Sequence, residues 1–169
     1  GSQWSEWIDS FSQTLYGVWG AAENDIHAVG VGGALRHWDG SNWTSLTNPG
    51  PGRDLFAVWG SSATNVFAVG RQGLILRYDG SSWAVSADFG VNDLDDVWGA
   101  DANNVFAVGG ALTPSQPVYH FDGSTWRLLS AGATSMLGSV TGFAADSVFI
   151  GGNGGTLRHF DGASWLPVR

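Results

Sequence analysis

The chain consists of short apolar runs that alternate with small polar residues. Runs of four or five residues, rich in valine, leucine and aromatic residues, are separated by glycine, asparagine, aspartate or serine. This pattern is typical of strands joined by tight turns. No stretch keeps a helical period over more than two turns, so no helix is predicted. In the clearest copy of the pattern the expected strands are Leu55–Trp59, Val66–Val69, Leu74–Tyr78 and Ser82–Val85.

The same pattern occurs four times along the chain. The glycine that ends a V-W-G or V-T-G element marks each copy, at Gly20, Gly60, Gly99 and Gly142, with steps of 40, 39 and 43 residues. Every copy also has an Asp-Gly pair whose aspartate lies four residues before a tryptophan, and we expect this pair to form a two-residue hairpin turn. Four antiparallel strands in a repeat of this length predict one blade of an all-β propeller.

The repeats predict a single propeller domain over residues 1–169, and the ends of the chain suggest contacts with other chains. The copies cover residues 14–46, 54–86, 93–129 and 136–168. Gln3–Trp7 is an additional copy of a fourth strand, so it competes with Ser164–Val168 for the edge of the last blade. Three arrangements fit these ends: a four-blade ring closed within one chain, a window on a longer array, and half of an eight-blade ring completed by a homodimer. In the last two arrangements an unpaired strand edge is a predicted contact between chains.

Composition narrows the choice of partner. The net charge is −8 and no lysine is present, so the chain lacks the basic surface that nucleic acids or anionic membranes require. The absence of cysteine excludes disulfides and thiolate metal sites. No apolar run has the length of a membrane span and no signal peptide is recognised. The compartment stays unassigned, with secretion or another extracytoplasmic location in a bacterium as a candidate.

One known class of repeat resembles this sequence. The order L-x-x-V-W-G, six residues, V-F-A-V-G, x-x-G-x-I-L and then Y-D-G-S-S-W is similar to the bacterial BNR or Asp-box propeller repeats, including the photosystem II assembly-factor-like propellers. The resemblance covers essentially the whole chain. Kelch repeats share the aromatic–Asp–Trp order but place a double glycine and a longer turn elsewhere, so they rank second. The resemblance implies the fold more than an activity, because these families include enzymes, lectins and assembly scaffolds.

The polar and aromatic positions that recur in each copy are interpreted as structural. The Asp-Gly aspartates are expected to bind nearby backbone N–H groups, and the V-W-G tryptophans to act as wedges between blades. The histidines that lie two residues before these aspartates are a blade apart, and none is expected to have a second metal ligand within its own blade. We therefore expect no metal and no cofactor, and we expect these histidines to hydrogen-bond neighbouring blades. The residues concerned are Asp39, Asp79, Asp122, Asp161, Trp19, Trp59, Trp98, His37, His120 and His159.

Departures from the repeat are better candidates for function. The third copy carries four extra residues within Gly110–Pro117, on the face where the blade-linking loops are expected. The acidic pair Asp95–Asp96 enters an innermost strand there. Two interpretations are open: the pair binds a cation or a basic group, or it is solvated surface charge. The candidate ligand-binding residues are Arg53, Arg71, Phe89, Asp93, Asp95 and Asp96.

Catalysis has little support in the sequence. No G-x-S-x-G nucleophile context is present. The sialidases that share Asp-box repeats need a dense active centre of polar residues, whereas this chain has only three tyrosines. The predicted function is a non-catalytic scaffold that binds a protein partner. The alternatives are a carbohydrate-binding, lectin-like propeller that binds a glycan, and a propeller fragment that assembles into a larger ring without a separate activity.

Overall fold

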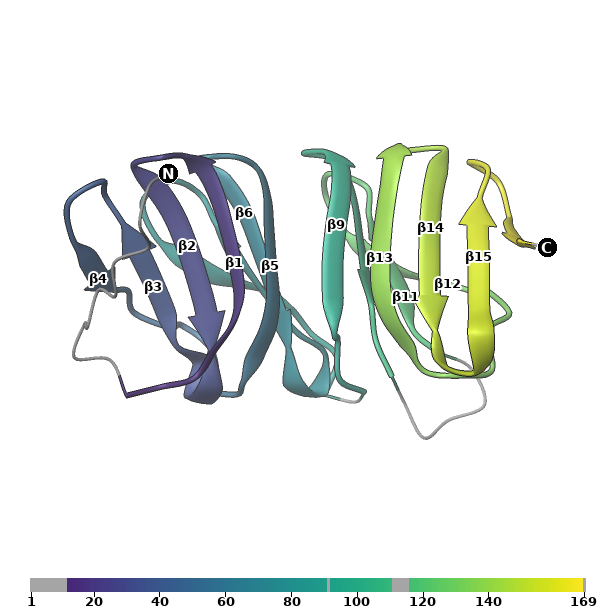
Figure 1. The fold of residues 1–169 in the computed structure, drawn as a ribbon, viewed down its shortest axis with the longest axis horizontal. Helices are drawn as coiled ribbons and strands as arrows, with labels where there is room; N and C mark the ends of the chain where they lie inside the picture. The colour runs from purple at the N-terminus through teal and green to yellow at the C-terminus, as the bar shows by residue number, and fades with distance from the viewer. Residues whose placement is uncertain (1–11, 91, 111–115, 169) are drawn as a thin grey trace, which may run out of the picture.

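The protein folds into four antiparallel sheets of four strands each. The computed structural model describes residues 12–90, 92–110 and 116–168 (Figure 1). In each sheet the strands lie side by side in chain order, and we call each sheet a blade. Blade 1 contains β1 (Leu15–Ala22), β2 (Asp25–Gly30), β3 (Leu35–Trp38) and β4 (Trp43–Ser45). Blade 2 contains β5 (Leu55–Ser62), β6 (Asn65–Gly70), β7 (Leu74–Tyr78) and β8 (Trp83–Asp88). Blade 3 contains β9 (Asp96–Asp101), β10 (Asn104–Val108), β11 (Val118–Phe121) and β12 (Trp126–Leu129). Blade 4 contains β13 (Leu137–Ala144), β14 (Ser147–Gly152), β15 (Thr156–Phe160) and β16 (Trp165–Pro167).

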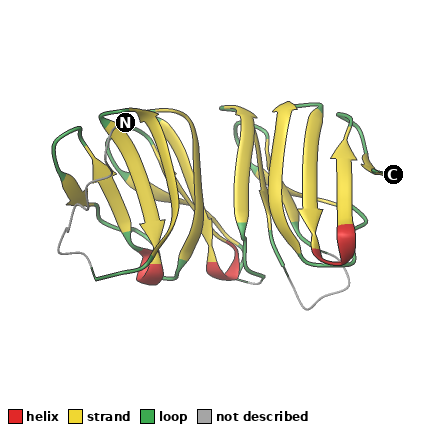
Figure 2. Ribbon diagram, in the orientation of Figure 1, coloured by secondary structure: helices red, strands yellow, loops and turns green. Residues whose placement is uncertain are grey.

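This architecture confirms the all-β fold with four repeats and four strands per blade. In blade 2 the innermost strand extends three residues beyond the predicted Trp59, because pairing with β6 continues through an irregularity between Gly60 and Ser62. The outermost strand runs from Trp83 to Asp88 and so ends three residues later than predicted. The only helical segments in the described part of the chain are three single 3-10 turns, at Val31–Gly33, Arg71–Gly73 and Asn153–Gly155 (Figure 2). No helix among the described residues is long and apolar enough to cross a membrane.

The Asp-Gly turns are two-residue hairpin loops, shifted by one residue from the prediction. In each blade the N–H of the aspartate donates to the carbonyl three residues on at 3.2 Å, so the loop of blade 2 is Gly80 and Ser81 rather than Asp79 and Gly80. In blade 2 the strands pair as far as Tyr78 and Trp83, and the loop between them is closed by Oδ1 of Asp79. This oxygen accepts the N–H groups of Ser81 and Ser82 at 2.8 and 2.9 Å. These bonds lower the pKa of Asp79 to about 2, and the predicted structural role of these aspartates is confirmed in all four blades. The glycine after the aspartate has φ between 91° and 96° in every blade, a conformation that other residues rarely adopt.

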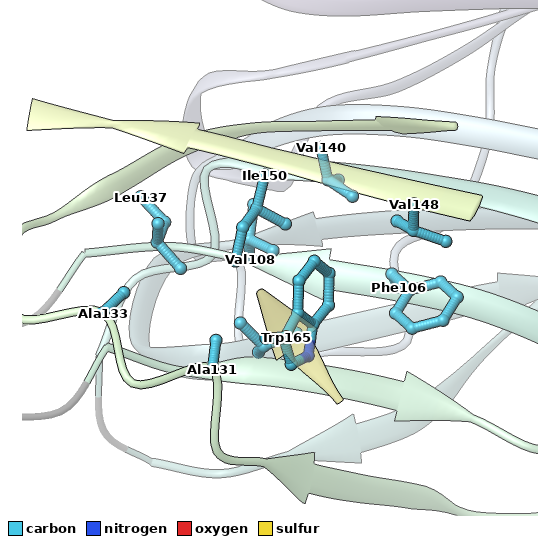
Figure 3. Close-up of a cluster of buried hydrophobic side chains, with 10 residues drawn as sticks. Phe106, Val108, Ala131, Ala133, Leu137, Val140, Val148, Ile150 and Trp165 are labelled. Carbon is cyan, nitrogen blue, oxygen red and sulfur yellow. The ribbon is translucent and has the colours of Figure 1, made fainter. Parts of the chain in front are cut away.

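The hydrophobic core lies between neighbouring blades. A phenylalanine in the second strand of one blade packs against two aromatic rings of the next blade. Phe67 lies 5.4 Å from Phe121 and 5.7 Å from Trp126, measured between ring centroids. Phe106 packs in the same way against Trp165, within the cluster between blades 3 and 4 that Figure 3 shows. Burial of these large rings accounts for much of the driving force that orders the blades.

The V-W-G tryptophans are wedges between blades, as predicted. Each indole lies against the V-W-G glycine of the following blade, where a Cβ on Gly60 would lie 2.6 Å from Cη2 of Trp19. Trp59 and Trp98 lie against Gly99 and Gly142 in the same way. The tryptophan and the glycine of the motif are therefore two halves of one contact that joins successive blades. Blade 4 has Thr141 at the tryptophan position.

The four blades form an open row, so the described part of the chain does not close into a four-blade ring by itself. Figure 1 shows blade 1 and blade 4 at opposite ends, with the innermost strands β1, β5, β9 and β13 side by side. The face of blade 1 that a preceding blade would cover is exposed to solvent. Val18 is 69% exposed, whereas the equivalent Val58, Val97 and Val140 are at most 9% exposed. Leu15 is 42% exposed, whereas the equivalent leucines of the other three blades are fully buried.

Candidate functional site

The predicted ligand-binding residues lie at the rim that carries the 3-10 turns and the blade-linking segments. Each of the two arginines is paired with an acid of this rim. Nη1 of Arg53 donates to Oδ1 of Asp88 at 2.8 Å, and Nη2 of Arg71 lies 3.5 Å from Oδ2 of Asp54. The Arg71 side chain is 54% exposed, so it is available to a partner molecule, whereas the pairing of Arg53 lowers the pKa of Asp88.

The three aspartates of the predicted site bind the protein's own backbone. Asp93 accepts the N–H of Gln72 at 2.8 Å, which ties blade 3 to the 3-10 turn of blade 2. Oδ2 of Asp95 accepts the N–H of Gly110 at 3.0 Å. Oδ2 of Asp96 accepts the N–H of Val140 at 2.9 Å and so joins blade 3 to blade 4. Both residues are half-buried and hydrogen-bonded to backbone, so the pair is not freely solvated surface charge, and burial raises the pKa of each carboxyl.

Phe89 also makes an internal contact. Its ring stacks on Tyr119 with 3.9 Å between centroids and 6° between planes. One face of Phe89 is therefore covered by the protein itself, and the ring is half-buried. Of the insertion Gly110–Pro117, residues 111–115 lie outside the described part. The structure thus brings the six predicted residues to one rim, mostly as bridges within and between blades, and their ligand-binding role stays a prediction.

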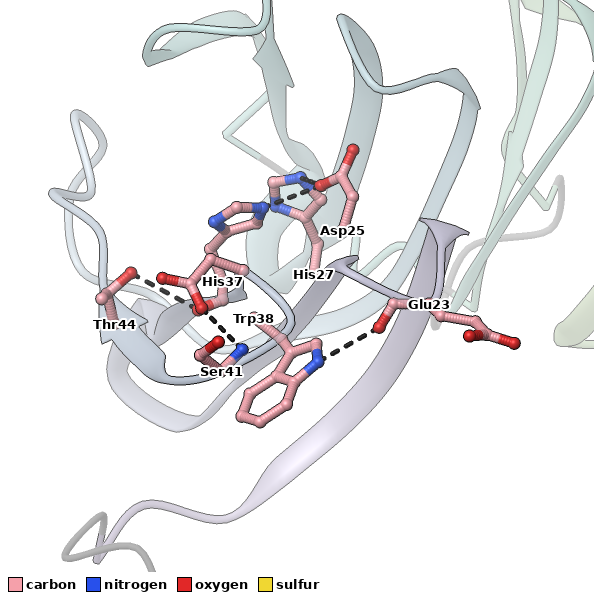
Figure 4. Close-up of polar contacts among 8 residues, drawn as sticks. Glu23, Asp25, His27, His37, Trp38, Ser41 and Thr44 are labelled. Atoms are coloured by element: carbon pink, nitrogen blue, oxygen red, sulfur yellow. Dashed lines mark hydrogen bonds and ion pairs between the residues drawn. The ribbon is translucent and has the colours of Figure 1, made fainter.

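A second polar cluster lies in blade 1, at the rim opposite the 3-10 turns. Asp25 and His27 are two residues apart on β2, and His37 lies directly opposite His27 on β3. Because side chains two apart on a strand share a face, all three point to the same side of the blade (Figure 4). Nε2 of His37 lies 2.8 Å from Oδ1 of Asp25, and Nε2 of His27 lies 3.6 Å from the same oxygen.

His27 is the unusual member of this cluster. Its side chain is fully buried, and neither ring nitrogen has a hydrogen-bond partner among the described residues. Desolvation, with a smaller contribution from His37, lowers the pKa of His27 to about 4, against the opposing effect of Asp25. The imidazole is therefore neutral at physiological pH. The neighbouring turn is held by hydrogen bonds from Trp38 Nε1 to the Glu23 carbonyl and from the Ser41 N–H to Asp39 (Figure 4).

Two predictions about the histidines are wrong. His37 does have further metal-type ligands within its own blade, namely Asp25 and His27. Two of the repeated histidines bond within their own blades rather than across them: His37 contacts Asp25 at 2.8 Å and His159 contacts Ser147 at 3.4 Å. Nε2 of the third, His120, has no hydrogen-bond partner among the described residues. The sequence did not predict the cluster because His27 lies outside the repeated histidine position. The pairing of β2 with β3 that brings His27 next to His37 is also not visible in the sequence. A detectable signal was the histidine at a position where the other copies have phenylalanine.

A third feature is a groove on the open face of blade 1. It has a volume of about 220 Å³ and is lined mainly by apolar side chains. Two of these, Tyr16 at 53% and Val18 at 69%, are among the most exposed large apolar residues of the described chain. The lining residues are Leu15, Tyr16, Gly17, Val18, Ala28 and Trp43.

Comparison with known proteins identifies the fold. No known family model and no curated protein matches the sequence. Among solved structures, YCF48 from Cyanidioschyzon merolae is 19% identical, with a TM-score of 0.66 over 90% of this chain and 52% of that one. A structure of YCF48 bound to D1 peptide is 16% identical, with a TM-score of 0.69 over 94% and 55%. The WD40 repeats of RRP9 are 11% identical, with a TM-score of 0.72 over 92% and 52%.

These likenesses show that the chain has the β-propeller fold. At such low identity they carry no further conclusion about activity. The chain spans about half the length of these three structures.

Proposed function

We propose that this chain is a non-catalytic β-propeller module that binds protein, and that its open blade faces pair with those of a second copy to complete an eight-blade ring. The observation that carries the proposal is the exposure of Val18 and Leu15, at positions that are buried in every other blade. A face built for contact with a preceding blade is most readily covered by another blade. A large exposed apolar face of this kind marks an interaction surface.

The two open faces have complementary residues. Within the chain, the phenylalanine of β6 or β10 packs against two aromatic rings of the following blade. Blade 4 retains this phenylalanine as Phe149, and blade 1 retains the two receiving rings as Trp38 and Trp43. Leu157 is 45% exposed, whereas Ile75, at the equivalent position, is buried against the next blade. Blade 4 of one copy therefore offers the side chains that blade 1 of another would bury.

The polar groups of the described chain support binding over catalysis. The acids and arginines at the predicted rim are engaged with the protein's own backbone or with each other. The grooves between the outer strands, of about 350 Å³ between blades 1 and 2 and about 380 Å³ between blades 3 and 4, are lined mainly by serine, alanine, leucine and aromatic residues. Neither brings a general acid and a general base together.

The rim with the 3-10 turns is the proposed surface for a different protein. The exposed Arg71 lies there, as do Gly110 and Pro117, and mixed charges at a rim set the rate and register of association. A neighbour of the same fold, YCF48, has been solved bound to D1 peptide, which supports a peptide segment as the type of partner. Reproducible glycan-array binding that is lost in Phe89→Ala would instead favour the lectin-like alternative.

A complementation experiment tests the self-association. Val18→Glu and Leu157→Arg each place a charge on one open face, and both positions are exposed, so we expect the fold of each variant to be retained. Each variant alone should sediment as one chain mass, because both contacts of its ring contain a buried charge. Mixed together they should form a dimer, because one contact is then unmodified and the other pairs glutamate with arginine.

The wild-type protein should sediment as two chain masses. A wild-type monomer at micromolar concentration, or a mixture that stays monomeric, would contradict the ring. A dimer that Val18→Glu disrupts but Leu157→Arg leaves intact would indicate a contact between two copies of the blade 1 face instead.

A further inference from the structure

We propose that Asp25, His27 and His37 form a binding site for a divalent transition-metal ion of the zinc class. Two imidazoles and one carboxylate are the ligand set that zinc and its neighbours prefer, whereas calcium and magnesium favour oxygen ligands alone. The site is independent of the proposed self-association, because it lies between blades 1 and 2 of one chain.

The distances fit a shared ion after movements of up to about 1.5 Å. The ligand atoms of the three residues all lie within 4.8 Å of one another. Bonds of about 2.0–2.2 Å in a tetrahedron place ligand atoms about 3.3 Å apart. The 3.6 Å between His27 Nε2 and Asp25 Oδ1 is close to this value, and the 2.8 Å between His37 Nε2 and the same oxygen must lengthen by about half an ångström.

Packing alone does not require a histidine at position 27. His27 lies 4.9 Å from Tyr78 and 5.7 Å from Trp83 of blade 2, measured between ring centroids. The equivalent Phe67 occupies the same aromatic niche at 5.4 and 5.7 Å from its two partners. A phenylalanine fills the niche without polar atoms, whereas His27 buries two ring nitrogens without hydrogen bonds. A buried polar group without a partner destabilises the folded chain, and a bound ion offsets this cost.

The other blades show what the scaffold needs at these three positions. In blade 2 they are Asn65, Phe67 and Arg77, and Nε of Arg77 donates to Oδ1 of Asn65 at 2.8 Å. In blade 4 they are Ser147, Phe149 and His159, with a single contact of 3.4 Å between serine and histidine. A polar pair on neighbouring strands is therefore the common structural element. Within the described chain, the carboxylate and the second imidazole are combined only in blade 1.

The site is accessible to an ion from solvent. The side chains of Asp25 and His37 are 21% and 24% exposed, whereas His27 closes the inner side of the cluster. Three protein ligands leave a fourth position of a tetrahedral ion free for water or for a donor atom of a bound molecule.

The test is metal binding to the whole chain after treatment with a chelator. Titration calorimetry with zinc chloride should show one ion per chain, and cobalt(II) should give the visible absorption of a low-symmetry site. His27→Phe copies the residue of the other blades, so it should fold normally. Loss of an outer-shell group typically costs 10–100-fold in affinity, so loss of this ligand should weaken zinc binding by at least about 100-fold.

Two further variants separate the site from general histidine chelation. Asp25→Asn introduces the residue that blade 2 has, and it should also weaken binding without unfolding the chain. His159→Gln alters the matching position of blade 4 and should leave zinc affinity unchanged within about twofold. Zinc should raise the melting temperature of the wild type and of His159→Gln but not that of His27→Phe. Absence of zinc binding, or equal affinity in the wild type and His27→Phe, would overturn the proposal.

Discussion

The contact between Trp19 and Gly60 predicts that one added methyl group will destabilise the junction of blades 1 and 2. A Cβ on Gly60 would lie 2.6 to 2.9 Å from three carbons of the Trp19 ring. Carbon atoms pack best at about 3.5–4.0 Å, so the indole or the strand must move by about 1 Å. Forced overpacking of this kind costs about 1–3 kcal/mol. We therefore expect Gly60→Ala to lower the free energy of unfolding by about that amount.

The matched control is Gly20→Ala in blade 1. Gly20 occupies the same position of the repeat but receives no tryptophan, and the nearest atom to its Cβ would be Cγ1 of Ile26 at 3.1 Å. This atom and the other neighbours need to shift by only a few tenths of an ångström, far less than the indole at Gly60, so we expect a change within about 1 kcal/mol. For a domain of this size 1 kcal/mol corresponds to about 2–4 °C in melting temperature. The two variants should therefore be distinguishable both by thermal and by urea-induced unfolding.

A double-mutant cycle identifies the cause. Trp19→Ala removes the ring, so adding Gly60→Ala to it should cost about 1–3 kcal/mol less than the same change in the wild type. Equal destabilisation by Gly60→Ala and Gly20→Ala would refute the wedge argument. So would a Gly60→Ala penalty that persists undiminished without Trp19.

Three further outcomes follow from the structure. The pKa of Asp79 in the folded chain is about 2, below its ordinary value of 3.8. The contribution of Asp79 to stability is therefore complete above about pH 4 and is lost as the pH falls towards 2. Urea unfolding across this range should show a weaker dependence on pH in Asp79→Asn than in the wild type. Asp96→Ala removes the acceptor that joins blade 3 to blade 4 and leaves the N–H of Val140 without its partner. In the same assay it should lower the free energy of unfolding by about 1–3 kcal/mol. An unchanged stability would mean that water replaces the bond. Thr141→Trp supplies the missing wedge opposite Gly20 of a second copy, so it should tighten dimerisation in sedimentation equilibrium, and weaker association would argue against this docking of blades.

The sequence allowed the blade and its joints to be predicted because their signals are local and repeated. The Asp-Gly turn recurs in all four copies and the Trp-Gly pair in three, at fixed spacing, and each has the same physical role at every junction or turn that it forms. The polar contacts were less predictable because their partners are backbone groups or residues placed by strand register. Asp93 binds the N–H of Gln72, which no side-chain pattern reveals. His27 required the register of β2 against β3, although a histidine in place of a repeated phenylalanine was a warning.

The most direct test of the ring is a disulfide between two copies. At each junction within the chain, the position equivalent to Leu157 in one blade and the position equivalent to Val18 in the next blade lie in one buried cluster. These pairs are Leu35 with Val58, Ile75 with Val97 and Val118 with Val140. In the proposed ring Leu157 of each copy therefore lies near Val18 of the other. The chain has no cysteine of its own, so an engineered pair has no competing thiol.

The measurement is mass after oxidation of the variant that carries Val18→Cys and Leu157→Cys. Ile75→Cys with Val97→Cys is the control, since it should close within one chain at the junction of blades 2 and 3. We expect the test variant to give a covalent product of two chain masses and nothing larger, because two copies close the ring. Monomer alone, when the control disulfide forms, or a ladder of longer products would contradict the eight-blade assembly.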